Sequence, residues 1–409
     1  MAELARTAGV QVISQLEQRV DGINPATFLG KGKTEELKLL CIELDIDVVI
    51  FDDELSPSQQ RTLERELEIK ILDRTALILD IFAKHARTRE GALQVELAQY
   101  EYRLPRLTRA WTHLARQAGG GAARGGAAGV GLRGPGETQL ETDRRLVRSR
   151  IAQLKDEIEQ VRRHREQYRR KREREGLQVI SLVGYTNAGK STLLNALTDA
   201  GVHAENKLFA TLDPVTRKLL LPSGRPVLLT DTVGFIQKLP TQLVAAFRAT
   251  LEEITDADLM LHVVDITHPN ARQQYEVVVQ VLAEIGAGDK PSLIALNKTD
   301  RLQDALRIDS FMVRHPQAVL ISALRKTGLD ELLAALDCIL KQGMVPVRLR
   351  IPFNEGELLP ILHSLGVVER EEAGEKHWNI EGLLPRSSVA RFQRYLARAT
   401  QDRRPGQPT

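Results

Sequence analysis

The chain of 409 residues has only two cysteines, Cys41 and Cys338, which lie far apart in apolar, helix-like surroundings. Two such thiols exclude a disulfide framework and fit a reducing compartment. The chain also lacks any apolar run long enough to span a membrane, and its N-terminus lacks a signal-peptide core. We therefore expect a cytoplasmic protein without a membrane span.

An excess of one charge is absent as well, because 57 Lys and Arg stand against 54 Asp and Glu, a net charge of +3. The sum says little about partners, whereas the distribution is informative: residues 162–174 are mostly Arg and Lys. The length allows about two to four domains.

The most informative segment reads G-Y-T-N-A-G-K-S and lies between an apolar run at 179–183 and a helical pattern from Thr192. A strand, a Gly-rich turn and a helix N-terminus in this order direct backbone N–H groups at a polyphosphate. Lys190 adds a positive charge, and Ser191 adds a hydroxyl ligand for Mg²⁺. The nucleotide-binding residues predicted here are Gly184, Tyr185, Thr186, Asn187, Ala188, Gly189, Lys190, Ser191 and Thr192.

A second segment follows the apolar strand 227–230 and consists of Asp231, Thr232, Val233 and Gly234. An aspartate at the carboxyl end of a strand can hold Mg²⁺ through water, and the Gly234 N–H can reach a γ-phosphate. Both groups are therefore predicted at the phosphate end of the site.

The base is indicated by Asn297, Lys298 and Asp300, which follow the strand 293–296. A carboxylate at Asp300 can accept both N1–H and N2–H₂ of guanine, a pair that adenine does not offer, and such sites discriminate by about 10⁴-fold. A further strand at 319–321 ends at Ser322, Ala323 and Leu324, whose backbone can meet guanine O6. The predicted ligands are GTP and GDP with Mg²⁺.

Residues 1–88 alternate between short strand patterns, the first at 11–13, and amphipathic helices, which predicts an α/β domain with a parallel sheet. Residues 28–33 combine two glycines with two lysines, for which an ordinary turn is favoured over a phosphate or RNA-backbone site. Apolar heptad positions at 93–114 and 140–168 predict a long antiparallel helical hairpin over 89–176, with a kink at Pro105.

The Gly-rich tip of this hairpin, 119–137, carries Arg124 and Arg133, and the second helix carries Arg163 and Arg170. Glycine allows close backbone approach and arginine pairs with phosphate, so these four residues are predicted RNA contacts. A flexible linker and a solvated helix face stay open as alternatives. Residues 177–343 are predicted as the nucleotide-binding domain, 344–401 as a small α+β domain ending in a helix at 386–399, and 402–409 as a disordered tail.

The chain resembles the HflX family of translational GTPases, in the wider Obg-HflX group. The matching words are FLGKG at 28–32, LDRT at 72–75, LQVELAQ at 93–99, RGPGETQLETD at 133–143, FATLDP at 209–214 and DTVGF at 231–235. The resemblance implies a P-loop G domain after an N-terminal α/β domain and hairpin. It also implies binding to the large ribosomal subunit and its RNA, and splitting of stalled or idle ribosomes. DNA is not an expected partner, and a monomer is expected.

The same resemblance implies a GTP hydrolysis site. Thr211 in the FATLDP word becomes a Mg²⁺ ligand beside Ser191 and Asp231, while Lys190, Thr211 and Gly234 act on the phosphates. Phe235 stands where Ras-like enzymes carry the glutamine that orients water, so hydrolysis alone should be slow. Asn187 matches a P-loop asparagine that helps seat K⁺ in some related GTPases, which makes K⁺ stimulation a hypothesis.

The sequence departs from the family pattern in two places. Relatives usually begin with a strand and most of a helix before the segment matching 1–9, and residues 121–129 look inserted. Two rival functions share much of the pattern: a GTPase that assists large-subunit assembly, and an RNA-remodelling ATPase acting through the N-terminal domain. Nothing in the sequence specifies an ATP site.

Overall fold

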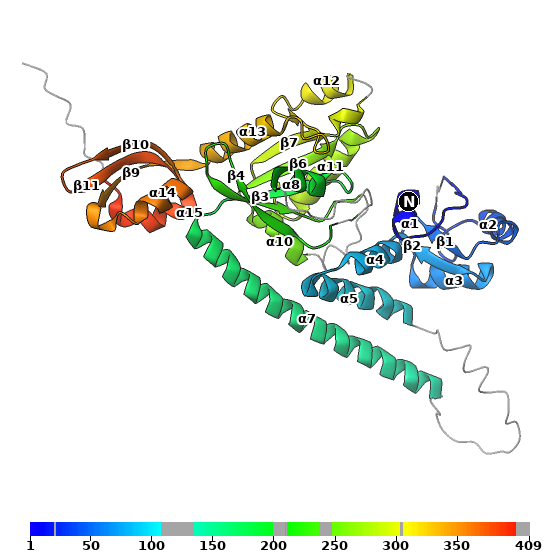
Figure 1. The fold of residues 1–409 in the computed structure, drawn as a ribbon. Coiled ribbons are helices and arrows are strands. Elements are labelled where there is room, and N and C mark those ends of the chain that lie inside the picture. The colour runs from blue at the N-terminus through cyan, green and yellow to red at the C-terminus, as the bar shows by residue number, and fades with distance from the viewer. Residues whose placement is uncertain are drawn as a thin grey trace, which may run out of the picture. The chain divides into compact units, whose positions relative to one another are not determined.

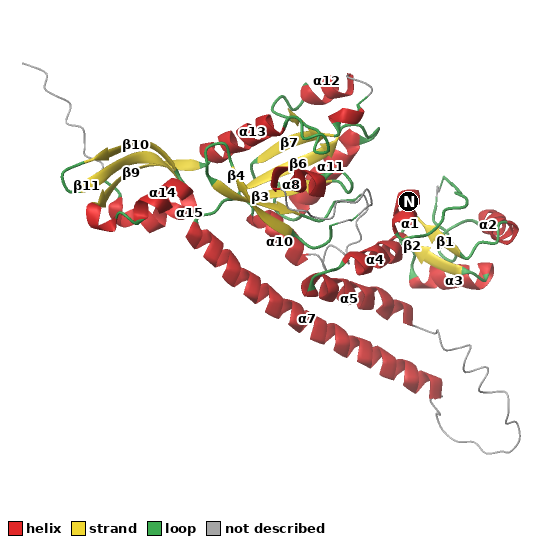
Figure 2. Cartoon of the chain, viewed as in Figure 1, coloured by secondary structure: helices red, strands yellow, loops and turns green. Residues whose placement is uncertain are grey.

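The computed structural model describes residues 1–19, 22–107, 135–198, 209, 211–236, 248–302 and 306–397. These residues form two compact units. The first comprises 1–162 with 205–213 and 238–249, and the second comprises 163–204, 214–237 and 250–409. Figure 1 follows the chain through both, and Figure 2 distinguishes helices from strands.

The first unit contains a parallel pair of strands covered by helices, as the alternating pattern predicts. Its elements are α1 (Ala2–Thr7), α2 (Lys31–Glu43), β1 (Val48–Phe51), α3 (Pro57–Leu67), β2 (Lys70–Asp73) and α4 (Arg74–His85). Leu63 and Ile71 are fully buried between α3 and the strands. The strand predicted at 11–13 does not form, and the Ile13 side chain is exposed. This segment therefore does not pack against the sheet.

Three helices of this unit begin at a residue whose side chain caps the first turn. Ser56 and Gln59 form a reciprocal capping box at α3, and the Asp73 carboxylate accepts from the Ala76 N–H at 2.8 Å at α4. Thr88 caps the next helix, α5 (Arg89–Arg103), by accepting from the Gly91 N–H. These short polar residues therefore set where the helices begin.

The segment 209–213 also belongs to this unit and is held on both flanks. The Phe209 ring is buried and packs edge-on against Phe82, with ring centroids 4.7 Å apart. The Asp213 carboxylate accepts from the backbone N–H groups of Arg87 and Thr88, both at 2.8 Å, and from the Thr88 hydroxyl. This loop is therefore fixed at the junction between α4 and α5.

The predicted hairpin is present as α5 and α7 (Pro135–Glu175), which lie side by side in Figure 1. Leu93 and Leu97 of α5 pack on the fully buried Leu154 of α7, so the apolar heptad positions do form one seam. Arg89 pairs with Glu157 while Glu96 pairs with Arg150, which fixes an antiparallel direction. The tip, with Arg124 and Arg133, lies outside the described residues.

Pro105 ends the first helix instead of kinking it. α5 stops at Arg103 and continues as a short 3-10 turn, η1 (Leu104–Leu107). Proline lacks the N–H that would bond to the carbonyl four residues earlier, so the α-helical ladder stops there. The predicted continuation of the seam beyond this turn lies outside the described residues.

The second unit is built on a six-stranded sheet of order β4-β5-β3-β6-β7-β8, parallel except for β4. Leu182, Leu261 and Leu293 lie in one apolar cluster with α8 and α13, while Val264 and Leu296 pack with α11 and α12. The strands are β3 (Val179–Gly184), β4 (Val215–Leu220), β5 (Pro226–Asp231), β6 (Leu259–Asp265), β7 (Ser292–Asn297) and β8 (Val319–Leu320). The helices are α8 (Lys190–Thr198), α10 (Arg248–Asp256), α11 (Ala271–Glu284), α12 (Leu306–Met312) and α13 (Leu329–Gln342), with the short turn η2 (Thr299–Arg301).

A small antiparallel module follows in the same unit. Its sheet has the order β10-β11-β9, and Ile351 and Phe392 are among its fully buried residues. Its elements are β9 (Met344–Pro352), η3 (Phe353–Glu355), α14 (Leu358–Leu365), β10 (Val367–Ala373), β11 (His377–Pro385), α15 (Arg386–Val389) and η4 (Ala390–Tyr395). The single helix predicted at 386–399 was wrong: one α-helical turn passes into a 3-10 helix that ends before Leu396, whose backbone bridges to Leu349 of β9.

The predicted fold class is confirmed: a P-loop G domain preceded by a parallel α/β domain and an antiparallel hairpin, and followed by a small α+β module. Within the described part of the chain, no helix is long and apolar enough to cross a bilayer.

A buried ion pair joins the turn before β5 to α13 within the second unit. Arg225 Nη2 lies 2.6 Å from Asp337 Oδ1, and both side chains are less than a tenth exposed. Burial alone raises the pKa of Asp337, but hydrogen bonds from Arg225, Lys341 and Ser223 outweigh it and hold that pKa below its usual value. The aspartate is therefore a charged group that depends on its partners.

Replacing Arg225 with Met should lower the free energy of unfolding of this unit by about 3 kcal/mol, because it leaves a buried carboxylate without its main partner. Urea unfolding would measure the loss, and the double change Arg225→Met with Asp337→Leu should recover most of it. The control Arg272→Ala removes an exposed pair with Glu276 and should cost under about 0.5 kcal/mol. Equal losses for Arg225→Met and Arg272→Ala would show that the buried pair contributes no more to stability than an exposed pair.

Candidate functional site

The predicted phosphate loop follows β3 and leads into α8, as its sequence requires. Lys190, the first residue of α8, is 6% exposed, and its Nζ donates to the carbonyls of Gly184 at 3.2 Å and Tyr185 at 3.1 Å. Burial lowers the pKa of Lys190 to about 8, against the opposing effect of the Asp231 carboxylate. The loop thus encloses an amine that lacks a full counter-charge and suits an anion.

Gly234 approaches this amine because it has no side chain. A Cβ at Gly234 would lie 2.7 Å from Thr186 Cα, closer than side chains approach a backbone atom, and 3.0 Å from Lys190 Nζ. The backbone locks this approach: Thr186 N–H donates to Phe235 O at 2.8 Å, and Phe235 N–H donates to Gly184 O at 3.1 Å. The Phe235 ring itself is buried, so it cannot orient water.

A hydroxyl and a carboxylate meet at the base of the loop. Ser191 Oγ donates to Asp231 Oδ2 at 2.6 Å, and Asp231 is fully buried at the end of β5. Thr232 Oγ1 donates to Leu182 O at 2.6 Å and keeps β5 against β3, while the Val233 side chain is buried. A buried carboxylate beside a hydroxyl matches the oxygen ligands that Mg²⁺ prefers, so the residues present fit that ion.

The other end of the site is formed by the loop after β7. Asn297 Nδ2 donates to Ala188 O at 2.9 Å, and its Oδ1 accepts from the Ala323 N–H at 3.0 Å. Gly189, with φ of +99°, passes under this amide, and a Cβ there would collide with Asn297 Nδ2. One buried amide thus joins the phosphate loop to the loop after β8.

Lys298 and Asp300 follow on the same turn. Lys298, in the left-handed conformation, donates from Nζ to Asn187 O at 2.8 Å. The Asp300 carboxylate accepts from Ser322 Oγ at 2.5 Å, so the hydroxyl orients the group predicted to read guanine. Leu324 is largely exposed. The structure therefore brings Asn187, Asn297, Lys298, Asp300 and Ser322 to one edge of the sheet.

Asp265 and Thr267 also belong to this cluster, and the sequence analysis did not predict them. Asp265 closes β6, and its Oδ2 lies 2.7 Å from Lys298 Nζ, while its Oδ1 accepts from the N–H and hydroxyl of Thr267 at 3.0 and 2.6 Å. Asp265 could have been predicted, because it ends an apolar strand that is parallel to the strands ending at Asp231 and Asn297. The carboxyl ends of such strands meet at one edge.

The remaining predicted residues lie elsewhere or outside the description. Thr211 lies in the segment 209–213 of the first unit, and its role as a Mg²⁺ ligand stays a prediction. Arg163 is exposed on α7, whereas Arg124, Arg133 and the side chain of Arg170 lie outside the described residues.

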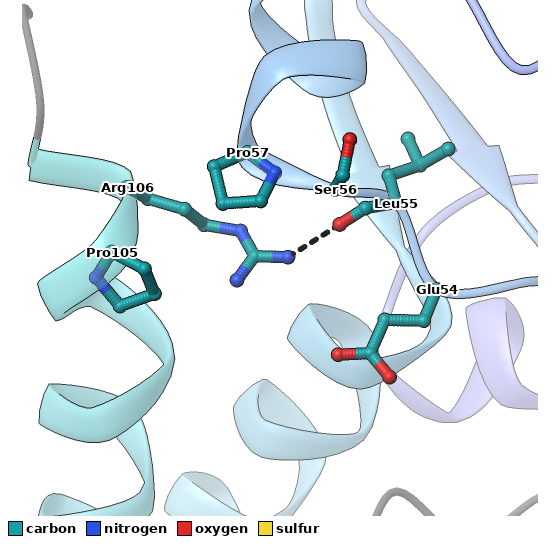
Figure 3. Close-up of a pocket in the computed structure, with 6 residues that line it drawn as sticks. All are labelled: Glu54, Leu55, Ser56, Pro57, Pro105 and Arg106. Atoms are coloured by element: carbon teal, nitrogen blue, oxygen red, sulfur yellow. Dashed lines mark hydrogen bonds between the residues drawn. The ribbon is translucent and has the colours of Figure 1, made fainter. Parts of the chain in front are cut away.

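A hollow in the first unit is lined by Glu54, Leu55, Ser56, Pro57, Pro105 and Arg106 (Figure 3). Its one cation, Arg106, already donates to Leu55 O at 2.8 Å and Gln60 Oε1 at 3.0 Å, and pairs with the buried Asp73 at 3.0 Å. Its guanidinium also stacks over the Tyr102 ring at 3.5 Å. This arginine serves the fold, so the hollow gives no support to a second nucleotide site.

Three family models match the chain in sequence order. They are described as GTP-binding GTPase N-terminal over residues 1–83, GTP-binding GTPase Middle Region over 85–172, and 50S ribosome-binding GTPase over 179–298. The chain is also similar to a GTP-binding protein from Sulfolobus solfataricus solved in complex with GDP. That likeness is 26% identity, with a TM-score of 0.44, over 83% of this chain and 94% of the other.

Curated relatives are more similar still. The GTPase HflX of Caldanaerobacter subterraneus subsp. tengcongensis is 48% identical over 92% of this chain and 84% of its own length. The GTPase HflX of Escherichia coli is 46% identical over 90% of this chain and 84% of its own length. Agreement at this level over nearly the whole chain, together with the family models, shows that the protein belongs to the HflX family of GTPases and is a GTP hydrolase.

Proposed function

We propose that this GTPase binds the large ribosomal subunit and dissociates stalled or idle ribosomes, with GTP binding favouring engagement and hydrolysis favouring release. The observation that carries the proposal is the hairpin of α5 and α7, whose second helix presents Arg162 and Arg163 on its exposed surface. A basic helix joined to a Gly- and Arg-rich tip suits an RNA partner. The match of residues 179–298 to the 50S ribosome-binding GTPase model supports the choice of subunit.

Each end of the nucleotide has a proposed set of partners. Lys190 would contact the β- and γ-phosphates, Ser191, Thr211 and Asp231 would hold Mg²⁺, and Gly234 would sense the γ-phosphate. When bound, Mg²⁺ would supply positive charge that offsets the charge of the phosphates. Asp300 accepts the guanine N–H groups. Asn187 would help to bind K⁺, and stimulation of hydrolysis by K⁺ stays a prediction.

Hydrolysis should be slow in the isolated protein because Phe235 stands where Ras-like enzymes carry the glutamine that orients water. Phe235 is 3% exposed, and its backbone is bonded on both sides to the phosphate loop, so the ring is not available for that task. We expect a group that orients water to come into place only when a partner binds. This is the behaviour expected of a switch whose hydrolysis is timed by engagement.

The proposal is tested by sedimenting the purified protein with large subunits. Co-sedimentation should be strong with GTP or a non-hydrolysable analogue and weak with GDP, because only the γ-phosphate orders the switch segments. The analogue should also support subunit separation measured by light scattering. A strict need for hydrolysis in that separation would contradict the model, and a protein that sediments only with subunit precursors would favour the rival role in assembly.

The RNA-remodelling ATPase rival is tested through Lys190. ATP turnover that survives Lys190→Ala would have to come from another site. The engaged Arg106 in the hollow of the first unit gives that rival no support.

Guanine recognition predicts a change of base preference. Calorimetry should find GDP bound about 10⁴-fold more tightly than ADP, because adenine leaves the Asp300 carboxylate unpaired. Asp300→Asn replaces one acceptor with a donor and should shift preference from GDP to xanthosine diphosphate, which presents an oxygen where guanine has its amino group. The matched control Asp289→Asn lies in the loop before β7 and should leave the preference unchanged. Equal affinity of the wild type for GDP and ADP would overturn the guanine assignment.

Nucleotide affinity should also depend on pH through Lys190. Its pKa of about 8 in the free protein means that the amine is charged below this pH and becomes neutral above it. Because phosphate favours the charged amine, binding above pH 8 requires proton uptake, and GDP affinity should fall up to about tenfold per pH unit. Titrations at pH 7, 8 and 9 measure the slope. Lys190→Arg keeps its charge and should remove it, and a flat wild-type profile would refute the coupling.

A further inference from the structure

The amine of Lys298 is held by two groups from different loops. Its Nζ donates to Asn187 O at 2.8 Å in the phosphate loop and lies 2.7 Å from Asp265 Oδ2 at the end of β6. The Lys298 and Asp265 side chains are 19% and 14% exposed, so water screens this pair less than a surface pair. Lys298 therefore connects the base end of the site to the phosphate end, and Asp265 decides where its amine points.

The Asp265 carboxylate is itself fixed. Its Oδ1 accepts from the Thr267 N–H at 3.0 Å and the Thr267 hydroxyl at 2.6 Å, which leaves Oδ2 directed at the lysine. A carboxylate locked on one oxygen loses little entropy when the other binds an ammonium group. The Asp265 carboxylate therefore does more than stabilise the turn after β6, because its second oxygen pairs with Lys298, which lies outside that turn.

The backbone at both contacts is conformationally demanding. Lys298 has φ of 68° and Asn187 has φ of 61°, each a left-handed conformation that costs a residue other than glycine free energy. The bond between Lys298 Nζ and Asn187 O joins these two positions directly. Loss of Asp265 would leave the amine free to turn toward solvent and would loosen both loops together.

We infer that Asp265, locked by Thr267, is a positioning residue that sets Lys298 across the phosphate loop and thereby fixes the spacing between the guanine and phosphate ends of the site. The inference rests on the nucleotide site proposed above. A nucleotide must satisfy both ends at once, so fixing their spacing before binding strengthens affinity for GDP and GTP alike. Asp265 touches neither base nor phosphate in this role.

The test is a double-mutant cycle on GDP affinity. Asp265→Asn keeps the shape but removes the charge that holds Lys298, and GDP should bind about tenfold more weakly, the fold-change expected for a hydrogen bond to a charged group. Lys298→Ala should weaken GDP binding as well. Adding Asp265→Asn to Lys298→Ala should then cause little further loss, because both changes remove the same clamp.

Two readouts separate this role from a purely structural one. The single-turnover rate at saturating GTP should match the wild type in Asp265→Asn, since only binding is affected. Thr267→Val removes the hydroxyl that donates to the carboxylate but keeps the backbone N–H bond and the charge, so it should give a smaller loss of affinity in the same direction. If Asp265→Asn does not fold, Thr267→Val in the Lys298→Ala background completes the cycle in its place.

Two results would overturn the inference: losses that multiply fully in the double variant, or a GDP affinity unchanged by Asp265→Asn. Failure of the proposed nucleotide site itself is distinguishable, because it would appear in the wild type as equal affinity for GDP and ADP. The matched control Asp330→Asn, in the first turn of α13, should leave GDP affinity unaltered.

Discussion

The nucleotide site depends on the side-chain amide of Asn297. It donates to the carbonyl of Ala188 and accepts from the N–H of Ala323, and it is almost fully buried. An amide carries its donor and its acceptor on two separate atoms, so Asp or Leu at this position would leave a buried backbone group unpaired. Because Gly189 leaves room for it, three loops from distant parts of the sequence come together around one residue.

The site was largely predictable because its chemistry follows the ends of parallel strands. β3, β5, β7 and β8 are short apolar runs, and each is followed at once by the polar residues that matter, so the order of the motifs implied their meeting. Asp265 was missed although it follows the same rule at β6, because its partner Lys298 is revealed only by the fold. The pair of Arg225 and Asp337 was hidden for the same reason, since nothing local in either segment indicates the other.

The errors of prediction arose where local pattern competes with packing. Residues 11–13 look like a strand, but a strand forms only when a neighbour accepts its hydrogen bonds. Residues 386–399 have a helical pattern, yet the chain tightens into a 3-10 helix where Phe392 packs into the small module and Leu396 bridges to β9. Pro105 shows the opposite case, in which a single residue overrules a helical pattern through the loss of one donor.

The segment that contains Thr211 has a short tether at each end. Phe209 packs against Phe82 and Asp213 is bound at the start of α5, so Thr211 is two positions along the chain from each attachment. Two residues of extended chain reach about 7 Å, and Thr211 can travel no further than that from either attachment while both hold. A larger excursion must pull the α4 and α5 junction along or detach from it. Within the first unit, a pull on this loop is therefore transmitted to the first turn of α5 through the Asp213 carboxylate.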